Sequence, residues 1–63
     1  MRLALEIEMD NDAFAGANGI EAGRILRELA WTLETVGQME VGQGRDLKDE
    51  NGNKVGSCRV FEN

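Results

Sequence analysis

The chain has 63 residues, of which 41% are hydrophobic and 30% are charged, a composition typical of one small globular domain. Twelve Asp and Glu residues against seven Lys and Arg residues give a formal net charge of -5, and there is no His and one Cys. The chain therefore lacks the groups for a Ser-His-Asp or Cys-His site, a structural zinc site or an internal disulfide. We expect a protein that is not an enzyme, with no catalytic residues, no bound metal and no cofactor.

The N-terminal segment carries charge at alternate positions from Glu6 onward and contains no long apolar run. A secretory signal peptide or a transmembrane helix needs such a run, so neither is expected there. The lone Cys58 fits a reducing compartment, and Met1 at the start indicates a complete small gene product. We therefore expect a cytoplasmic protein that does not bind a membrane.

The first half of the sequence predicts a strand followed by a helix. Residues 2–9 alternate, with polar or small side chains on one face and Leu3, Leu5, Ile7 and Met9 on the other, which is the period of a half-buried strand with its apolar face toward the core. Apolar residues then recur every three or four positions over residues 19–36, as on one face of a helix. Asn18 and Glu21 have the spacing of a capping box, and Gly37 offers the left-handed residue that ends the helix. The predicted core stripe consists of Ala22, Ile25, Leu26, Leu29, Leu33 and Val36.

The second half predicts two more strands, at residues 39–48 and 54–61. Gly42 and Gly44 interrupt the first of these strands and indicate a bulge or an irregular approach. Between the strands, the Asp-Glu-Asn-Gly-Asn segment at 49–53 is typical of a tight turn, because Asn and Gly tolerate positive φ.

Apolar residues lie on both faces of the last strand, which favours a central position for it in the sheet. The prediction is one α+β domain over residues 1–63 with element order β-α-β-β. Its three-stranded sheet is expected in the order 1-3-2, with one helix packed across one face. Cys58 is interpreted as a small core residue under this helix.

The turn at 49–53 contains residue types of a calcium-binding loop, but their spacing is wrong. With Gly52 at the glycine position of an EF-hand, Leu47 would be the first ligand and Cys58 the last, and neither can take that role. The glycine-containing segments 16–19 and 42–44 match neither the dinucleotide-binding fingerprint nor the P-loop. These glycines are interpreted as loop and cap residues.

The last part of the chain contains the segment Asp49-Glu50-Asn51-Gly52-Asn53-Lys54-Val55-Gly56. Before it come a strand and an amphipathic helix that contains Ile25-Leu26-Arg27-Glu28-Leu29-Ala30. In this arrangement the chain resembles the small, mostly uncharacterised bacteriophage and prophage proteins that end in an Asp-x-Asn-Gly-Asn-x-Val-Gly hairpin. The resemblance implies a phage accessory protein in a bacterial host cell, and it implies no reaction. Some small acidic phage proteins block host defence systems, including CRISPR effectors, by occupying a nucleic-acid-binding surface, and the resemblance suggests this role by analogy.

The acidic residues gather in the first part of the chain. Residues 1–12 have a charge balance of -3, residues 13–44 a balance of -2, and residues 45–63 are neutral, which together give -5. On a strand, alternate residues lie about 7 Å apart on one face, so a row of carboxylates there can imitate backbone phosphates. The alternative is a solvated face that keeps the protein soluble. The carboxylates of this row are Glu6, Glu8, Asp10 and Asp12.

Trp31 points almost directly away from the predicted core stripe, at about 100° of helix rotation per residue. Arg24, Arg27 and Glu34 are its neighbours on the helix surface. An indole ringed by Arg and Glu has the composition of an interface hot spot. Alternatively, Trp31 folds over the helix edge or stacks on Arg27 as a cation–π pair.

The sequence is compatible with two functions. In the first, the chain binds a host protein and masks its nucleic-acid-binding surface, with the acidic row as the contact and Trp31 as an anchor. In the second, the chain is a structural module that forms a homodimer through its outer helix face. That face consists of Ile20, Arg24, Arg27, Trp31 and Glu34. Direct binding of nucleic acid is not expected, because the basic residues are interleaved with acidic ones.

Overall fold

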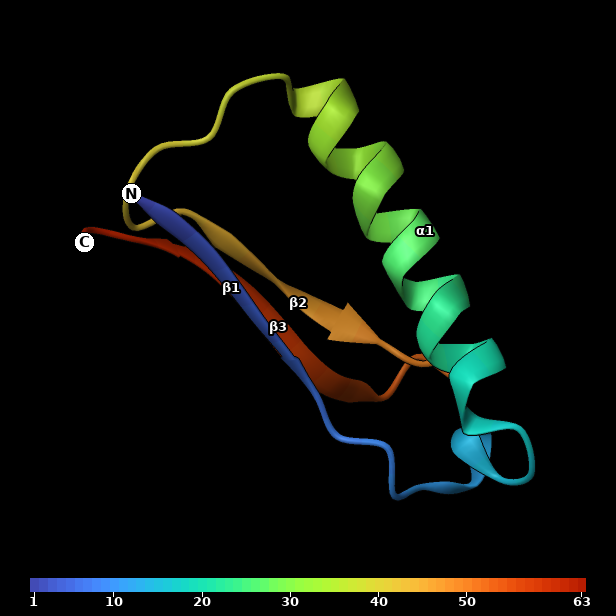
Figure 1. Ribbon diagram of the computed structural model, residues 1–63. Helices are drawn as coiled ribbons and strands as arrows, with labels where there is room; N and C mark the ends of the chain where they lie inside the picture. Colours follow the sequence, from blue (N-terminus) through green and yellow to red (C-terminus); the bar gives the residue numbers. More distant parts are fainter.

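One helix packs on one side of a three-stranded antiparallel sheet in the computed structural model, which describes residues 1–63 (Figure 1). The sheet order is β1-β3-β2, so the last strand is central. This confirms the predicted α+β fold, its β-α-β-β order and the strand order 1-3-2. The elements are β1 (Arg2–Ile7), a 3-10 turn η1 (Asp12–Phe14), α1 (Asn18–Val36), β2 (Gly44–Lys48) and β3 (Lys54–Phe61).

The bounds of α1 and β3 agree with the prediction to within one residue, whereas β1 and β2 are shorter than predicted. β1 ends at Ile7 rather than at residue 9, and the chain leaves the sheet after the Glu8 N–H donates to the Val55 carbonyl oxygen at 2.8 Å. β2 begins at Gly44 rather than at residue 39. The reason is Gly42, whose φ of 93° is a left-handed conformation that a strand does not continue through.

The two ends of α1 differ in how well the sequence predicted them. Ala17 precedes the helix without a side-chain cap, and Asn18 is already its first residue. The predicted capping box is therefore wrong, because the Glu21 carboxylate is engaged by groups outside the first turn. At the other end Gly37 has a φ of 85°, and its N–H donates to the Leu33 carbonyl oxygen at 2.9 Å, which confirms the predicted stop.

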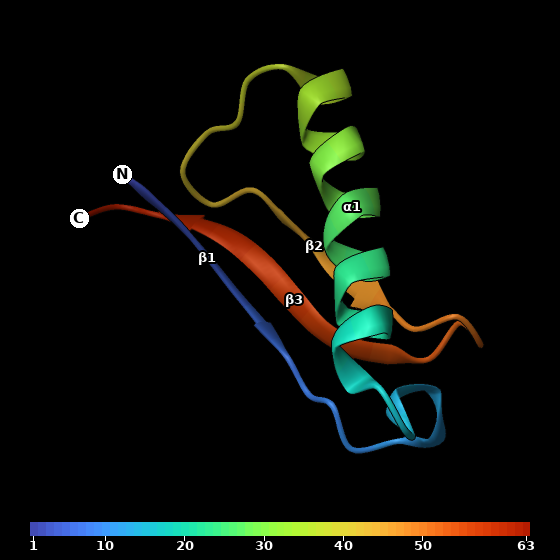
Figure 2. The ribbon, with the colours of Figure 1, turned by 45° about the vertical axis from the view of Figure 1, so that its right-hand side comes forward.

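The hydrophobic core is small and lies between the N-terminal half of α1, η1 and the sheet. Cys58 is 1% exposed, as expected of a core residue under the helix. Leu26 and Val36 of the predicted stripe are instead 42% and 54% exposed. Val36 ends α1, and the C-terminal part of this helix rises away from the sheet in Figures 1 and 2, whereas Leu26 stands about 100° around the helix from Ile25, at the margin of the buried stripe. The core residues are Phe14, Ile25, Leu29, Leu47, Val55 and Cys58.

The bulge expected at the glycines of β2 lies at the other end of that strand. The register shifts between Leu47, which pairs with Gly56, and Lys48, which pairs with Lys54. Val55 therefore has no partner on β2. This extra residue allows Val55 to join the core, although strict alternation along β3 would place it on the face opposite Cys58.

β1 is largely uncovered, and its prediction as a half-buried strand is wrong. Leu3 and Leu5 are 45% and 44% exposed, although Leu5 pairs with Cys58 and shares its side of the sheet. A helix about 10 Å wide covers only about two strands spaced about 4.8 Å apart. Figure 2 shows that α1 lies over the β2 side, so that β1 is the strand farthest from it.

Candidate functional site

The outer side of α1 presents Trp31 to solvent. Trp31 is 69% exposed and Ile20 is 73% exposed, whereas Ile25 and Leu29 on the sheet side are 3% and 6% exposed. At about 100° per residue, Trp31 lies roughly 200° around the helix from Leu29. Trp31 is therefore exposed on the outer side of the helix, as its place in the sequence predicts. We call Ile20, Arg27, Trp31 and Glu34 the Trp31 face.

The charged neighbours of Trp31 are not engaged within the chain. The structure contains one cation–π contact, in which Arg2 lies over the Phe61 ring at 4.8 Å from its centroid, so the alternative of Trp31 stacking on Arg27 is not observed. Neither Arg27 nor Glu34 forms a salt bridge. The charges beside the indole are consequently available to a partner molecule.

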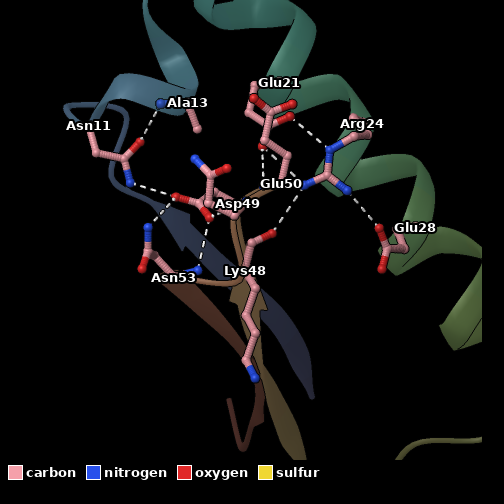
Figure 3. Close-up of polar contacts among 10 residues, drawn as sticks. Asn11, Ala13, Glu21, Arg24, Glu28, Lys48, Asp49, Glu50 and Asn53 are labelled. Carbon is pink, nitrogen blue, oxygen red and sulfur yellow. Dashed lines mark hydrogen bonds and ion pairs between the residues drawn. The ribbon is translucent and has the colours of Figure 1, made fainter.

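Arg24 was predicted to belong to this face, but it points into a polar cluster at the edge of the sheet (Figure 3). Its guanidinium donates to both carboxylate oxygens of Glu21 at 2.8 and 3.0 Å and to Glu28 at 2.8 Å. It also donates to the Lys48 carbonyl oxygen at 3.3 Å. Glu21 and Glu28 stand at i−3 and i+4 from Arg24, a spacing that favours ion pairs on a helix. Arg24 thus supports the fold and is not free to bind a partner.

Glu21 connects α1 to the turn between β2 and β3. Its side chain is buried, and it accepts a hydrogen bond from the Glu50 backbone N–H at 2.8 Å (Figure 3). The hydrogen bond from Arg24 lowers the pKa of Glu21 below the ordinary value of 4.5, although burial acts in the opposite direction. Glu21 is therefore held in its charged form by contacts with the helix and with the hairpin.

Asp49 organises the turn itself. Its Oδ1 atom accepts hydrogen bonds from the backbone N–H groups of Asn51 and Asn53, each at 2.9 Å. Its Oδ2 atom accepts from the side-chain amides of Asn11 at 2.7 Å and Asn53 at 3.3 Å (Figure 3). Burial by itself would raise the pKa of Asp49, but these hydrogen bonds outweigh burial and lower it below 3.8.

This cluster is a structural element rather than a binding site. Every buried side-chain nitrogen and oxygen has a hydrogen-bond partner, so no group in the cluster awaits a ligand. No set of three or more His, Cys, Asp or Glu side chains is arranged to hold a metal ion. The cluster fixes the first turns of α1 to the loop before it and to the β2–β3 turn. We call its members the hairpin clasp: Asn11, Glu21, Arg24, Asp49 and Asn53.

The acidic row divides between two places. Glu6 and Glu8 border one hollow, together with the cation Lys54, on the side of the sheet that α1 leaves open. Asp10 lies in the loop after β1, and Asp12 begins η1. On this side of the sheet, Ala4 lies between Arg2 and Glu6 on β1, and Arg59 of β3 pairs with Ala4. Acidic and basic side chains are therefore interleaved on this surface. We call this surface the open sheet face: Arg2, Ala4, Glu6, Ser57, Arg59 and Phe61.

Trp31 and Glu6, which were predicted to act on one partner, lie on opposite layers of the molecule. Glu6 pairs with Ser57, on the side of the sheet away from Cys58 and the helix. Trp31 lies on the side of α1 away from the sheet. One flat partner surface cannot contact both residues, so the Trp31 face and the acidic row are two separate surfaces.

Comparison of the chain with models of protein families, with curated protein sequences and with solved structures found no match. Neither α1 nor η1 combines the length and apolar character needed to cross a membrane.

Leu3 and Leu5 are the exposed residues that the sequence pattern assigned wrongly, because it placed them in the core. Leu26 and Val36 are the corresponding residues on α1. The signal that reveals Leu3 and Leu5 is the ratio of one helix to three strands, because a single helix is too narrow to cover all three.

Proposed function

We propose that this chain is a non-enzymatic protein-binding module whose Trp31 face docks on a partner protein. The observation that carries the proposal is the 69% exposure of Trp31 on the outer side of α1. Trp is strongly enriched among the residues that dominate the energy of protein interfaces.

The surroundings of Trp31 support this role. Ile20, at 73% exposure, adds a second apolar contact on the same side of the helix. Arg27 and Glu34 provide unpaired charges at the rim, the arrangement in which charged residues improve the specificity of an apolar anchor. The hairpin clasp holds the first turns of α1, from which Ile20 projects, against the β2–β3 turn.

The absence of an activated nucleophile favours binding over catalysis. The single thiol, Cys58, is 1% exposed and lies under the helix. The chain has no His, so an exposed Ser or Thr hydroxyl has no imidazole to activate it.

The charge of the chain indicates the kind of partner. A net charge of -5 favours association with a positively charged protein, and nucleic-acid-binding proteins carry such surfaces. The resemblance to small phage proteins supplies a setting in which a host protein of the bacterial cytoplasm would be masked in this way, as anti-CRISPR proteins do. Association of the Trp31 face with a second copy of itself is the competing possibility.

The test is affinity capture from nuclease-treated bacterial lysate on the immobilised chain, with the retained proteins identified by mass spectrometry. The Trp31→Ala variant is expected to bind the partner with an affinity at least about 30-fold lower, because truncation of a hot-spot residue costs at least about 2 kcal/mol of binding free energy. Val41→Ala, which trims another exposed apolar residue outside the Trp31 face, serves as the matched control and is expected to bind normally.

Capture at low and at high salt distinguishes a contact through the acidic row from a contact through the Trp31 face. Loss of the partner between low and high salt, together with weaker capture by the Glu6→Lys/Glu8→Lys double variant, would assign the acidic row to the interface. Equal capture by the parent chain and by Trp31→Ala would refute the Trp31 face as the contact. Retention of the chain itself and of nothing else would favour the homodimer.

A further inference from the structure

The outer edge of β1 carries unpaired backbone groups. β1 lies at the end of the sheet order and pairs with β3 alone (Figure 2). The Glu8 N–H bonds to the carbonyl oxygen of Val55, and residues along an antiparallel strand alternate in the direction of their backbone groups. The even-numbered residues therefore bond to β3, and the N–H and C=O groups of Leu3, Leu5 and Ile7 point toward solvent.

The same edge exposes apolar side chains. Leu3 and Leu5 are 45% and 44% exposed on the helix side of the sheet, where α1 does not reach β1, and Met1, which precedes β1, is 67% exposed. An edge strand with exposed leucines and free backbone groups is a template for another strand, unless charges or bulges protect it. The only charged side chains of β1 are Arg2 and Glu6.

The order of residues in β1 is self-complementary. Its first five residues are Arg2-Leu3-Ala4-Leu5-Glu6, with Ala4 at the centre. An antiparallel copy placed about a two-fold axis at Ala4 sets Arg2 opposite the partner's Glu6, and Leu3 opposite the partner's Leu5. Opposite charges and apolar pairs that face each other across strands stabilise a sheet.

We propose that the chain forms a homodimer in which β1 pairs antiparallel with β1 of a second copy about a two-fold axis at Ala4. Leu3 and the partner's Leu5 exchange both backbone hydrogen bonds, and Arg2 pairs with the partner's Glu6 on the open sheet face. Two three-stranded sheets thereby become one continuous sheet of six strands. The interface is isologous, since each contact occurs twice.

Other registers and the other edge fit less well. An axis at Glu6 would place two carboxylates opposite each other, and an axis at Leu5 would leave Glu6 opposite Ala4 with no cation. The β2 edge carries Arg45, Asp46 and Lys48 within five residues and ends in a bulge, which are features that protect an edge from pairing.

The small core of the chain gives a thermodynamic reason for pairing at β1. Only 9 of 63 residues are buried, and a domain of this length without a disulfide or metal has a marginal core. Pairing at β1 covers Leu3 and Leu5 and uses backbone groups that already have the strand conformation. The interface lies apart from the Trp31 face, so the dimer leaves that face open to a partner protein.

The first experiment measures the molar mass by sedimentation equilibrium from micromolar to several hundred micromolar protein. The parent chain is expected to dimerise. Arg2→Glu and Glu6→Arg are each expected to weaken the dimer about tenfold, because like charges then face each other twice. An equimolar mixture of the two variants is expected to recover dimerisation as a heterodimer, which also shows that both variants fold.

Trp31→Ala is expected to dimerise like the parent chain, which distinguishes this interface from a dimer through the outer helix face. A monomeric parent chain at several hundred micromolar would overturn the proposal. Loss of the dimer in Trp31→Ala, or failure of the Arg2→Glu and Glu6→Arg mixture to recover it, would also overturn the proposal.

Disulfide trapping fixes the register. The Ala4→Cys residues would face each other across the axis as a non-hydrogen-bonded pair, whose Cα atoms lie about 4.5 Å apart, within the range of about 4.4–6.8 Å found in disulfides. Oxidised glutathione should convert this variant to a covalent dimer. Ala30→Cys, at an exposed position of α1, is the matched control. This variant should stay monomeric under the same oxidising conditions, as should the parent chain with its buried Cys58. Equal cross-linking of the Ala4→Cys and Ala30→Cys variants would refute the axis at Ala4.

Discussion

The carboxylate of Glu21 accepts a hydrogen bond from the backbone N–H of Glu50 at 2.8 Å, across 29 positions of sequence (Figure 3). The same carboxylate is held by the Arg24 guanidinium at 2.8 and 3.0 Å. One buried side chain thus joins the first turns of α1 to the β2–β3 turn. In a chain with so small a core, this polar contact is expected to matter for stability.

Glu21→Gln tests this contact. The amide keeps the shape of the side chain but loses the charge. Its NH2 group replaces one of the two oxygens that accept hydrogen bonds, so this NH2 donor then faces an N–H donor of Arg24. We expect the midpoint of thermal unfolding to fall by about 4–8 °C, measured by circular dichroism. Glu28→Gln is the matched control, since Glu28 binds the same Arg24 with a side chain that is 72% exposed, and it should shift the midpoint little. Equal shifts in the two variants would contradict a special role for Glu21.

Asp49→Asn tests the other half of the hairpin clasp. In Asp49 one oxygen accepts two backbone N–H groups, and the other accepts the side-chain amides of Asn11 and Asn53. The substituted amide keeps one oxygen, but its NH2 group then opposes the two donating amides. We expect faster amide hydrogen exchange at Ala13, whose N–H bonds to Asn11, while exchange in the centre of α1 stays unchanged. Unchanged exchange at Ala13 would contradict the coupling.

The pH dependence of stability follows from the same two carboxylates. The pKa of Glu21 lies below its ordinary 4.5, and that of Asp49 lies below its ordinary 3.8. A lowered folded-state pKa gives stability that is fully present above the ordinary pKa and is lost as pH falls through the folded-state value. Urea unfolding should therefore give a nearly constant stability from pH 5 to 7 and a decline below about pH 4. This decline should be shallower in the Glu21→Gln variant. Equal declines in the variant and the parent chain would mean that groups other than Glu21 cause the loss of stability.

Local patterns in the sequence predicted most of the fold. The three-and-four spacing located α1, the left-handed Gly37 and Gly52 ended the helix and formed the hairpin turn, and apolar residues on both faces of β3 gave its central position. Each of these features depends on residues close together in the chain or on one strand. Such features are specified locally, which is why sequence periodicity detects them.

Burial and long-range polar contacts were not predictable in the same way. Alternation along β1 shows that Leu3 and Leu5 share a side of the sheet, but it carries no information on whether anything covers that side. The partner of Glu21 is a backbone N–H, a group that every residue except Pro has, so no residue type marks Glu50 as the contact. Arg24 is different, because its spacing from Glu21 and Glu28 already favoured ion pairs over a free binding role.

Gly56→Ala tests how closely β1 and β3 approach each other, and with it the framework of the proposed dimer. A Cβ atom at Gly56 would overlap the backbone carbonyl oxygen of Glu6, and backbone cannot move aside as a flexible side chain can. We expect a loss of about 1–3 kcal/mol in urea unfolding, as for overpacking in a core. Gly19→Ala is the matched control, because a Cβ there meets nothing within 4 Å and its helical position favours Ala, so stability should rise by about 0.5 kcal/mol. Equal stability of the Gly56→Ala variant and the parent chain would mean that β1 can shift away from β3, and an edge able to shift would not hold the register that places Arg2 opposite the partner's Glu6.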